Sequence, residues 1–171
     1  MIGLQRGKVK LSTYKPEWKK LYKKEEKLLL STIGKYVLDI QHVGATSIPG
    51  VKAKPIIDIA IGVKSLKVGE ECIKLLKKLG YEYKGDAGIR GRHFFAKGSE
   101  VNRTHYVHIE KLSGELWKNH ILFRDYLRKN KKIAKKYTEL KKKLAQKYKY
   151  DRDTYTTRKS AFIQKILKKL K

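Results

Sequence analysis

A turn of small residues followed by a carboxylate in an apolar run has the clearest chemical potential in this chain. The turn, His42–Gly50, reads HVGATSIPG, and the run after it, Lys54–Val63, reads KPIIDIAIGV with Asp58 at its centre. A carboxylate among Ile and Val side chains is costly to bury unless it is paired, hydrogen-bonded or bound to a metal. A turn that leaves backbone N–H groups free can cradle a phosphate. Together these features predict a nucleotide or phosphate site with Asp58 as its acidic anchor.

Four residues near Asp58 are candidates for binding phosphate groups. Gly44 permits a close backbone approach or a positive φ. The hydroxyls of Thr46 and Ser47 either donate to phosphate or bond to the backbone of their own turn. Lys54, at the start of the predicted strand, is placed to reach phosphate oxygens, although most lysines of this chain are expected to be solvated.

A second group of polar side chains lies on a predicted strand over 103–111. Its alternating pattern places Tyr106, His108 and Glu110 on one face. If this strand lies beside the strand of Asp58, His108 and Glu110 stand next to that carboxylate. Three roles are then open to the cluster: a general base with its orienting partner, a metal site that includes a transition-metal centre for hydrolysis, or a hydrogen-bond network. His120, on the apolar stripe of a later helix, is expected to be a buried, hydrogen-bonded histidine.

Arginine is scarce in this chain, which makes its positions informative. Of the 43 basic residues only eight are Arg, and the rest are Lys. A guanidinium group binds carboxylate or phosphate through two parallel hydrogen bonds, whereas Lys acts as a point charge. Arg92 and Arg103 flank the predicted site, so we expect them to contact anionic groups of the ligand.

The formal net charge of +27 draws attention to nucleic acid as a partner. The excess of Lys over Arg argues against sequence-specific recognition, because bidentate contacts to bases favour Arg. The lysines are instead expected to lie on solvated helix faces. Weak, salt-sensitive attraction to polyanions is expected whatever the function.

Other features bear on the cellular compartment. No apolar run approaches the roughly 20 residues that a membrane helix needs. The N-terminus lacks the apolar segment of a signal peptide, and the single Cys72 cannot form an internal disulfide. These features predict a cytoplasmic protein without a membrane partner.

The elements that position these residues follow an α+β order. Helical spacing of apolar residues predicts a helix from Pro16 to Gly34 and another over 66–79. Strands are predicted over 37–43, 55–63, 81–84, 92–97 and 103–111, and the pattern from Ser113 onward is helical. We expect a single domain over 1–171, in which a small mixed sheet backed by helices forms an α/β core over 1–111 and C-terminal helices over 112–171 pack on it.

Further motifs occur in order along the chain: YKPEW at 14–18, RHFF at 92–95, RTHYVHIE at 103–110, FRDYLR at 123–128 and KSAFI at 159–163. With the turn and strand motifs above, they make the chain resemble the GrpB family. The resemblance covers nearly the whole chain and implies a nucleotidyltransferase-like fold. Related domains also occur fused to dephospho-CoA kinase.

In the superfamily that this resemblance implies, a turn after the first strand binds triphosphate and two acids on the second strand hold Mg²⁺. Asp58 stands where the first acid belongs, but Ala60 occupies the second position. Mg²⁺ keeps several waters, so Asp58 and nucleotide phosphates suffice for one ion, with Glu110 as a further ligand. The implied function is binding of a nucleotide or other phosphorylated ligand, with Mg²⁺-dependent nucleotidyl transfer as its enzymatic form. The alternative is a non-catalytic module that senses a ligand or binds RNA or another polyanion.

Overall fold

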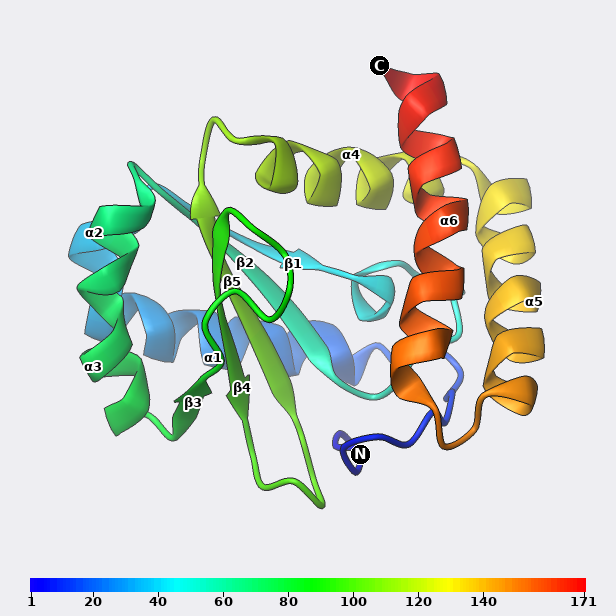
Figure 1. Cartoon of the computed structure of the whole chain (residues 1–171), viewed down its shortest axis with the longest axis horizontal. Coiled ribbons are helices and arrows are strands. Elements are labelled where there is room, and N and C mark those ends of the chain that lie inside the picture. Colours follow the sequence, from blue (N-terminus) through cyan, green and yellow to red (C-terminus); the bar gives the residue numbers. More distant parts are fainter.

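The structure, a computed structural model, describes residues 1–171 and is built around an open five-stranded sheet (Figure 1). The strands are β1 (Asp39–Val43), β2 (Ile57–Val63), β3 (Tyr81–Tyr83), β4 (Arg92–Lys97) and β5 (His105–Lys111), in the order β1-β2-β5-β4-β3. β2 and β5 are parallel, and all other neighbours are antiparallel. The expected α+β class with a mixed sheet is confirmed.

The register of the two central strands decides which side chains share a face. Asp58 pairs with Tyr106, and Gly62 pairs with Glu110. Because side chains alternate along a strand, Asp58, His108 and Glu110 lie on one face of the sheet, in that order along its length. The strand of His108 therefore lies beside the strand of Asp58, as the sequence required for a joint site.

The opposite face of the sheet carries the main hydrophobic core. It is covered by α1 (Glu17–Ile33), α2 (Leu66–Glu70) and α3 (Cys72–Lys78), and α1 runs behind the sheet in Figure 1. The buried side chains of this core include Trp18, Leu29, Ile33, Ile57, Ile59, Ile61, Cys72, Leu76 and Val107. Full burial of one Ile or Leu side chain contributes about 1.5–3 kcal/mol. This layer is therefore the largest source of apolar stabilisation.

The predicted helix over 66–79 is two helices in the structure, separated at Glu71. Gly69 weakens this segment, because glycine inside a helix costs about 1 kcal/mol relative to alanine. Packing nevertheless requires it: a Cβ at Gly69 would lie 2.9 Å from the His93 ring and 3.0 Å from Ile109. The first of the two helices, α2, thus approaches β4 and β5 closely, and the helical segment is interrupted at Glu71.

Strand starts are the other difference from the prediction. β1, β2 and β5 each begin two residues later than the apolar pattern suggests. Before β1 the chain completes a 3₁₀ turn over Gly34–Tyr36. Before β2, Pro55 has no backbone N–H to donate to a neighbouring strand. These shifts leave the positions of Asp58 and His108 within the strands unchanged.

Three C-terminal helices lie on the side of the polar face: α4 (Glu115–Lys129), α5 (Lys131–Lys147) and α6 (Arg152–Leu170). α4 packs on β1, β2 and β5, whereas α5 and α6 pack on α4 and on each other. α5 and α6 lie side by side at the right of Figure 1, with α6 in front. Together with α4 and the loop after β1 they form a second hydrophobic cluster that includes Ile48, Val51, Phe123, Tyr137 and Leu167. The Asp151 side chain caps the start of α6 by accepting a hydrogen bond from the Thr154 amide at 3.0 Å.

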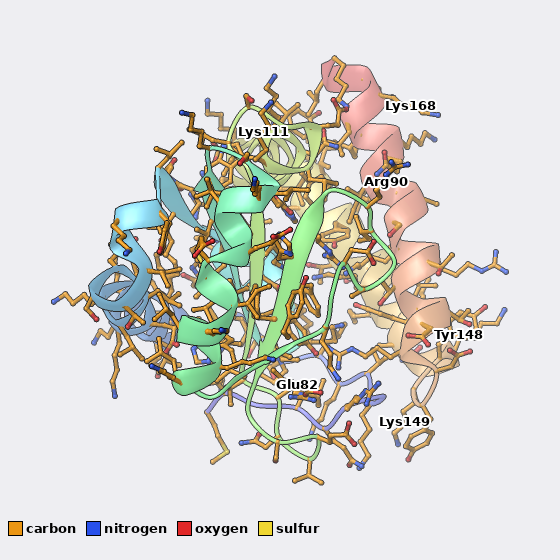
Figure 2. The ribbon with its side chains drawn as sticks, turned by 60° about the vertical axis from the view of Figure 1, so that its left-hand side comes forward. Glu82, Arg90, Lys111, Tyr148, Lys149 and Lys168 are labelled. Carbon is orange, nitrogen blue, oxygen red and sulfur yellow. The ribbon has the colours of Figure 1, made fainter.

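The surface carries lysines on many sides. Figure 2 shows Lys111, Lys149 and Lys168 projecting from separate regions of the molecule. This distribution agrees with the expectation of lysines on solvated faces. None of the helices combines the length and the apolar character that crossing a membrane would require.

Candidate functional site, a cationic cavity beside Asp58

A cavity of about 720 Å³ lies between the polar face of the sheet and helix α6. The charged part of its lining is mostly basic and consists of Lys54, Arg92, Arg124, Lys141, Arg152 and Lys159, against Asp58, Glu110 and Asp153. Aromatic rings also line it, those of Phe94, Phe123, Tyr106, Tyr137 and Tyr155. Such a lining favours a ligand that combines negative charge with a flat apolar part.

Arg92, His108 and Asp58 form a chain of hydrogen bonds on the sheet side of the cavity. The Arg92 guanidinium donates to Nδ1 of His108 at 2.9 Å. An acceptor at Nδ1 places the proton of a neutral imidazole on Nε2, which lies 3.2 Å from Oδ1 of Asp58. His108 thus donates to Asp58, and both of its ring nitrogens are engaged. This arrangement makes His108 a positioning residue for the Asp58 carboxylate.

Electrostatics keeps Asp58 ionised and His108 neutral. Burial alone would raise the pKa of Asp58, but the hydrogen bond from His108 and the charges of Lys54 and Lys159 outweigh burial and lower this pKa. Burial lowers the pKa of His108, in spite of the attraction of Asp58. The pair at neutral pH is therefore a carboxylate and an uncharged imidazole. The Asp58 side chain remains 29% exposed, so it can contact a ligand.

Gly44 lies against Asp58 just after β1. Its φ of 69° and ψ of −177° belong to a region that is essentially restricted to glycine. A Cβ added there would lie 2.7 Å from Oδ2 of Asp58. Backbone conformation and close approach thus both require glycine, and the missing side chain leaves one side of the carboxylate uncovered.

The hydroxyls of the turn are engaged in local hydrogen bonds. Ser47 Oγ donates to the Gly44 carbonyl at 2.6 Å, within a 3₁₀ turn over Ala45–Ser47. Thr46 Oγ1 lies 3.0 Å from Nε2 of the buried His42, whose ring stacks on Tyr22. Burial lowers the pKa of His42 to about 4. Ser47 thus makes the local backbone bond that is one of its two predicted roles, whereas Thr46 contacts the side chain of His42.

Lys54 and Lys159 meet on the opposite wall of the cavity, although they are far apart in the sequence. Their ammonium groups lie 5.4 Å and 5.7 Å from the centre of the Tyr155 ring. Burial lowers the pKa of both lysines, and repulsion from the nearby Arg152 lowers it further, while Asp58 opposes the shift. None of these three cations forms a salt bridge with a carboxylate. The wall therefore holds basic groups that no salt bridge pairs, with Asp58 as the one nearby charge that attracts Lys54 and Lys159.

Arg103 lies away from the cavity, in contrast to the phosphate contact expected for it. Its guanidinium donates to Glu82 at 2.5 Å and to the Gly98 carbonyl at 2.7 Å, and only 4% of its side chain is exposed. Its backbone pairs with Leu4 of the N-terminal segment. Arg103 thus ties together three segments of the fold, while Arg92, the other predicted arginine, does line the cavity.

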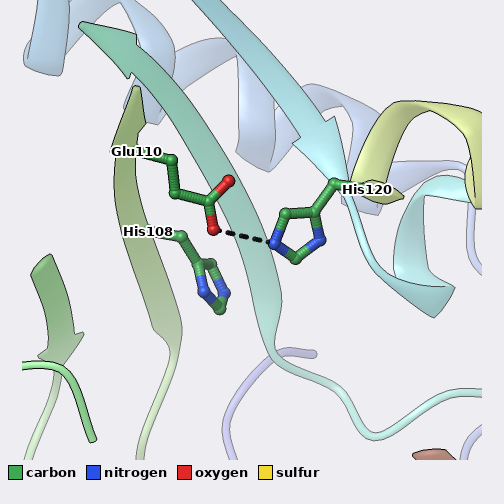
Figure 3. Close-up of side chains that lie close together, drawn as sticks. All are labelled: His108, Glu110 and His120. Atoms are coloured by element: carbon green, nitrogen blue, oxygen red, sulfur yellow. Dashed lines mark hydrogen bonds and ion pairs between the residues drawn. The ribbon is translucent and has the colours of Figure 1, made fainter. Parts of the chain in front are cut away.

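Glu110 lies at the other end of the cavity from Asp58. Their register positions are four residues apart, which corresponds to about 13 Å along a strand. The structure therefore does not bring Asp58 and Glu110 together as ligands of one ion. Glu110 instead meets His120 of α4, whose Nε2 lies 3.0 Å from Oε1 of the carboxylate, with His108 beside them (Figure 3).

His120, Arg152 and Lys159 line the cavity without having been assigned to a site from the sequence. The pattern around His120 predicts a buried, hydrogen-bonded histidine. The hydrogen bond exists, with Glu110 as its partner, but the side chain is 29% exposed and not buried. Arg152 and Lys159 are two basic residues among many in the C-terminal helices. The one signal that could have singled out Lys159 is its place at the start of the KSAFI motif.

Comparison with known proteins gives this geometry a context. The family model described as GrpB protein matches residues 8–169. The chain belongs to the GrpB family. The glutamate-rich protein GrpB of Alkalihalophilus pseudofirmus is 42% identical over 99% of this chain and 100% of its own length. The UPF0157 protein YqkA of Bacillus subtilis is 39% identical over 74% of this chain, which is 37% of YqkA.

Solved structures extend the comparison to the fold. The crystal structure of the conserved protein GrpB from Enterococcus faecalis has a TM-score of 0.78 and 33% identity, and the match covers 92% of this chain and 99% of that protein. The MgGTP-bound Cid1 poly(U) polymerase has a TM-score of 0.54 at 13% identity, over 78% of this chain and 44% of Cid1. The nucleotidyltransferase-like fold of this GrpB-family chain is therefore confirmed, whereas a likeness this distant carries no activity with it.

Proposed function

We propose that the cavity binds the phosphate groups of a nucleotide or other phosphorylated ligand. The observation that carries this proposal is the group of cations without a carboxylate partner, Lys54, Arg152 and Lys159. Taking such charges partly out of water is costly unless an opposite charge compensates for them. Phosphate oxygens are strong acceptors for ammonium and guanidinium groups, and they would provide that compensation.

The rest of the cavity supports a ligand larger than phosphate. Its volume of about 720 Å³ lies in the range that small-molecule sites occupy, roughly 300–1,000 Å³. Phe94 and Tyr106 pack against each other with ring centres 5.1 Å apart on the sheet side. Aromatic faces of this kind can stack on a nucleobase, for about 1–3 kcal/mol per base. A nucleotide would use both the cationic wall and these rings.

Mg²⁺ fits this site only together with such a ligand. The ion prefers oxygen ligands and is usually held by one or two carboxylates together with substrate phosphates. Asp58 provides one carboxylate, Ala60 provides none, and Lys54 and Lys159 repel a free cation. Asp58 would hold the ion on the protein side, where it would neutralise charge on the phosphates.

Nucleotidyl transfer is the more specific form of the proposal, and the geometry supports it less than binding. His108 is engaged by Arg92 and Asp58 at its two ring nitrogens, so neither is free to accept a proton from an acceptor hydroxyl. Ala60 also leaves the second metal ion of the usual mechanism without its ligand. In this proposal His108 holds Asp58 in place for ligand binding.

A second candidate function is binding of RNA or another polyanion on the outer surface. A second groove, of about 930 Å³, lies beside α1, α4 and α5 and shares Thr46 and Arg124 with the cavity. Its basic lining residues are Lys19, Lys23, Arg124, Arg128, Lys131 and Lys135, and Glu26 is its one acidic residue. Binding that rests on such a groove releases counterions and weakens steeply as salt is added.

Thermal unfolding with a ligand panel separates the two functions. The panel contains ATP, GTP, CTP, UTP, pyrophosphate and single-stranded RNA, each with and without Mg²⁺. A ligand at 100 times its Kd stabilises the folded state by about 2.7 kcal/mol, which is about 5–10 °C in Tm at this size. We expect a rise that is selective among nucleotides and is increased by Mg²⁺.

Asp58→Asn sharpens this test because it removes a metal ligand and also a negative charge near the phosphates. We expect the variant to lose the gain from Mg²⁺ but to bind the metal-free nucleotide at least as tightly as the wild type. Equal shifts with all polyanions, unchanged by Asp58→Asn and abolished by salt, would contradict the cavity proposal and support the groove.

A further inference from the structure

His108, Glu110 and His120 form a compact cluster at one end of the cavity (Figure 3). One ligand atom from each residue lies within 4.8 Å of the others. Two of the residues come from the central strand β5 and the third from α4, so the sheet and a helix packed on it hold the cluster from two sides. The rings of His108 and His120 have centres 5.1 Å apart.

The Glu110 carboxylate is not satisfied by its surroundings. The residue is 1% exposed, and its Oε2 atom is buried without any hydrogen-bond partner. Its Oε1 atom has one partner, Nε2 of His120. Arg92 pairs with Glu110 in the strand register but directs its guanidinium to His108 and to the Asp86 carbonyl. A buried carboxylate in this state is costly unless a cation binds beside it.

We propose that His108, Glu110 and His120 bind a divalent transition-metal ion of the Zn²⁺ type. Two imidazoles and one carboxylate are a donor set of zinc sites that keep a further position open for water or substrate. Imidazole ligands favour transition metals, whereas Mg²⁺ prefers oxygen ligands. The open position would face the cavity, because all three residues line it.

Asp58 has a defined role in this metal site. His108 lies between Asp58 and Glu110 along the sheet, and its Nε2 faces Asp58 while its Nδ1 accepts from Arg92. If Nδ1 binds the metal in place of the Arg92 contact, Nε2 keeps its proton and continues to donate it to the Asp58 carboxylate. A carboxylate that orients a metal-bound histidine in this way is a common outer partner in metal sites. Asp58 thus belongs to the metal site without being a ligand.

The proposal does not rest on nucleotide binding and can be tested without a nucleotide. The untagged full-length chain is treated with EDTA, dialysed and titrated with Zn²⁺ by calorimetry, and with Co²⁺, whose visible absorption reports the coordination geometry. We expect one ion per chain and a Co²⁺ spectrum typical of four- or five-coordination with nitrogen ligands. Mg²⁺ at the same concentration should not compete.

Variants identify the ligands. His120→Gln is the main variant, because its side chain is 29% exposed and the fold should tolerate the change. We expect it to weaken Zn²⁺ binding by more than about 100-fold, beyond the roughly 10–100-fold that loss of an outer partner costs. Asp58→Asn should weaken binding by about 10-fold. His105→Gln is the matched control, since His105 lies on the same strand but on the other face.

Three results would overturn the proposal: no saturable binding of one Zn²⁺ per chain, equal affinities in His120→Gln and His105→Gln, or displacement of Zn²⁺ by equal Mg²⁺. Circular dichroism of each variant confirms that it is folded. Because the nucleotide panel can be repeated on the EDTA-treated chain, loss of the metal site and loss of the phosphate site give separate results.

Discussion

Buried charged groups are paired on one face of the sheet, whereas some of those on the other face lack partners. On the face under α1, the buried Glu25 carboxylate accepts hydrogen bonds from Lys97 at 2.7 Å and from Tyr81 at 2.8 Å. On the face under α6, the carboxylate of Glu110 keeps one oxygen without a partner, and Lys54 and Lys159 have no salt bridge. The buried carboxylate on the first face is thus paired, whereas the second face has unpaired charged groups that a ligand or an ion would satisfy.

From this difference we infer that the face under α1 stabilises the fold and that the face under α6 binds ligands. Removing one partner of a paired buried charge destabilises a fold, and a buried charge that is unpaired in the fold lowers its stability unless something binds. The face under α1 also carries the larger hydrophobic cluster. Substitutions on that face should therefore change the free energy of unfolding, and substitutions in the cavity should change affinity for ligands.

The largest effect on stability is expected from Leu29→Ala. Leu29 is fully buried in the core under α1, and truncation of such a side chain costs about 2–5 kcal/mol through lost burial and the cavity left behind. Leu28→Ala is the matched control, because Leu28 is 39% exposed on the same helix and should cost little. Urea denaturation of the two variants measures the difference, and equal losses would contradict the assignment of this core.

The next effect is a dependence of stability on pH through His42. Burial lowers the pKa of His42 from 6.5 to about 4 in the folded state. Below pH 6.5 the unfolded chain therefore binds a proton that the folded chain does not bind. The contribution of neutral His42 to the free energy of unfolding is present above pH 6.5 and is lost as the pH falls toward 4. The loss amounts to up to about 3 kcal/mol. Denaturation of the wild type and His42→Gln between pH 7 and 4 measures it, and parallel curves would rule out this role.

A smaller effect is expected from Gly44→Ala, which changes the turn after β1 beside Asp58. Gly44 and Gly50 both have positive φ, but only Gly44 would place a Cβ against Asp58, while Gly50 has open space around it. Strained backbone costs about 1–3 kcal/mol. We expect Gly50→Ala to cost stability alone, and Gly44→Ala to cost stability and also Mg²⁺-dependent nucleotide affinity. Equal loss of affinity in the two variants would contradict a role of Gly44 beside Asp58.

Most of the framework of this site could be predicted from the sequence. The apolar run around Asp58 and the alternation around His108 are strong local signals for two strands. That these two strands pair was a condition left open by the sequence, and the structure meets it. The fold class followed from the order of elements and from the family motifs. The local role of the Ser47 hydroxyl was one of two roles open to such a residue.

The parts that could not be predicted depend on contacts between distant segments. Arg103 has its partner in Glu82, on another strand, and no local pattern indicates that pair. The apolar stripes of α6 predict a packed helix but not the side of the sheet on which it lies. The basic wall formed by Lys54 and Lys159 exists only because α6 lies on the side of the polar face.

The most direct measurement compares Lys159→Gln with Lys168→Gln in calorimetric titrations with pyrophosphate and with ATP. Both variants remove one positive charge from α6, but Lys159 lines the cavity and Lys168 is exposed on the surface. A hydrogen bond to a charged group contributes about 1.5–3 kcal/mol, so we predict that Lys159→Gln weakens binding by at least about 10-fold and leaves the free energy of unfolding unchanged or higher. Lys168→Gln should bind as the wild type does. Equal weakening in the two variants would show that the overall charge, and not the cavity, attracts the ligand, and would contradict the account.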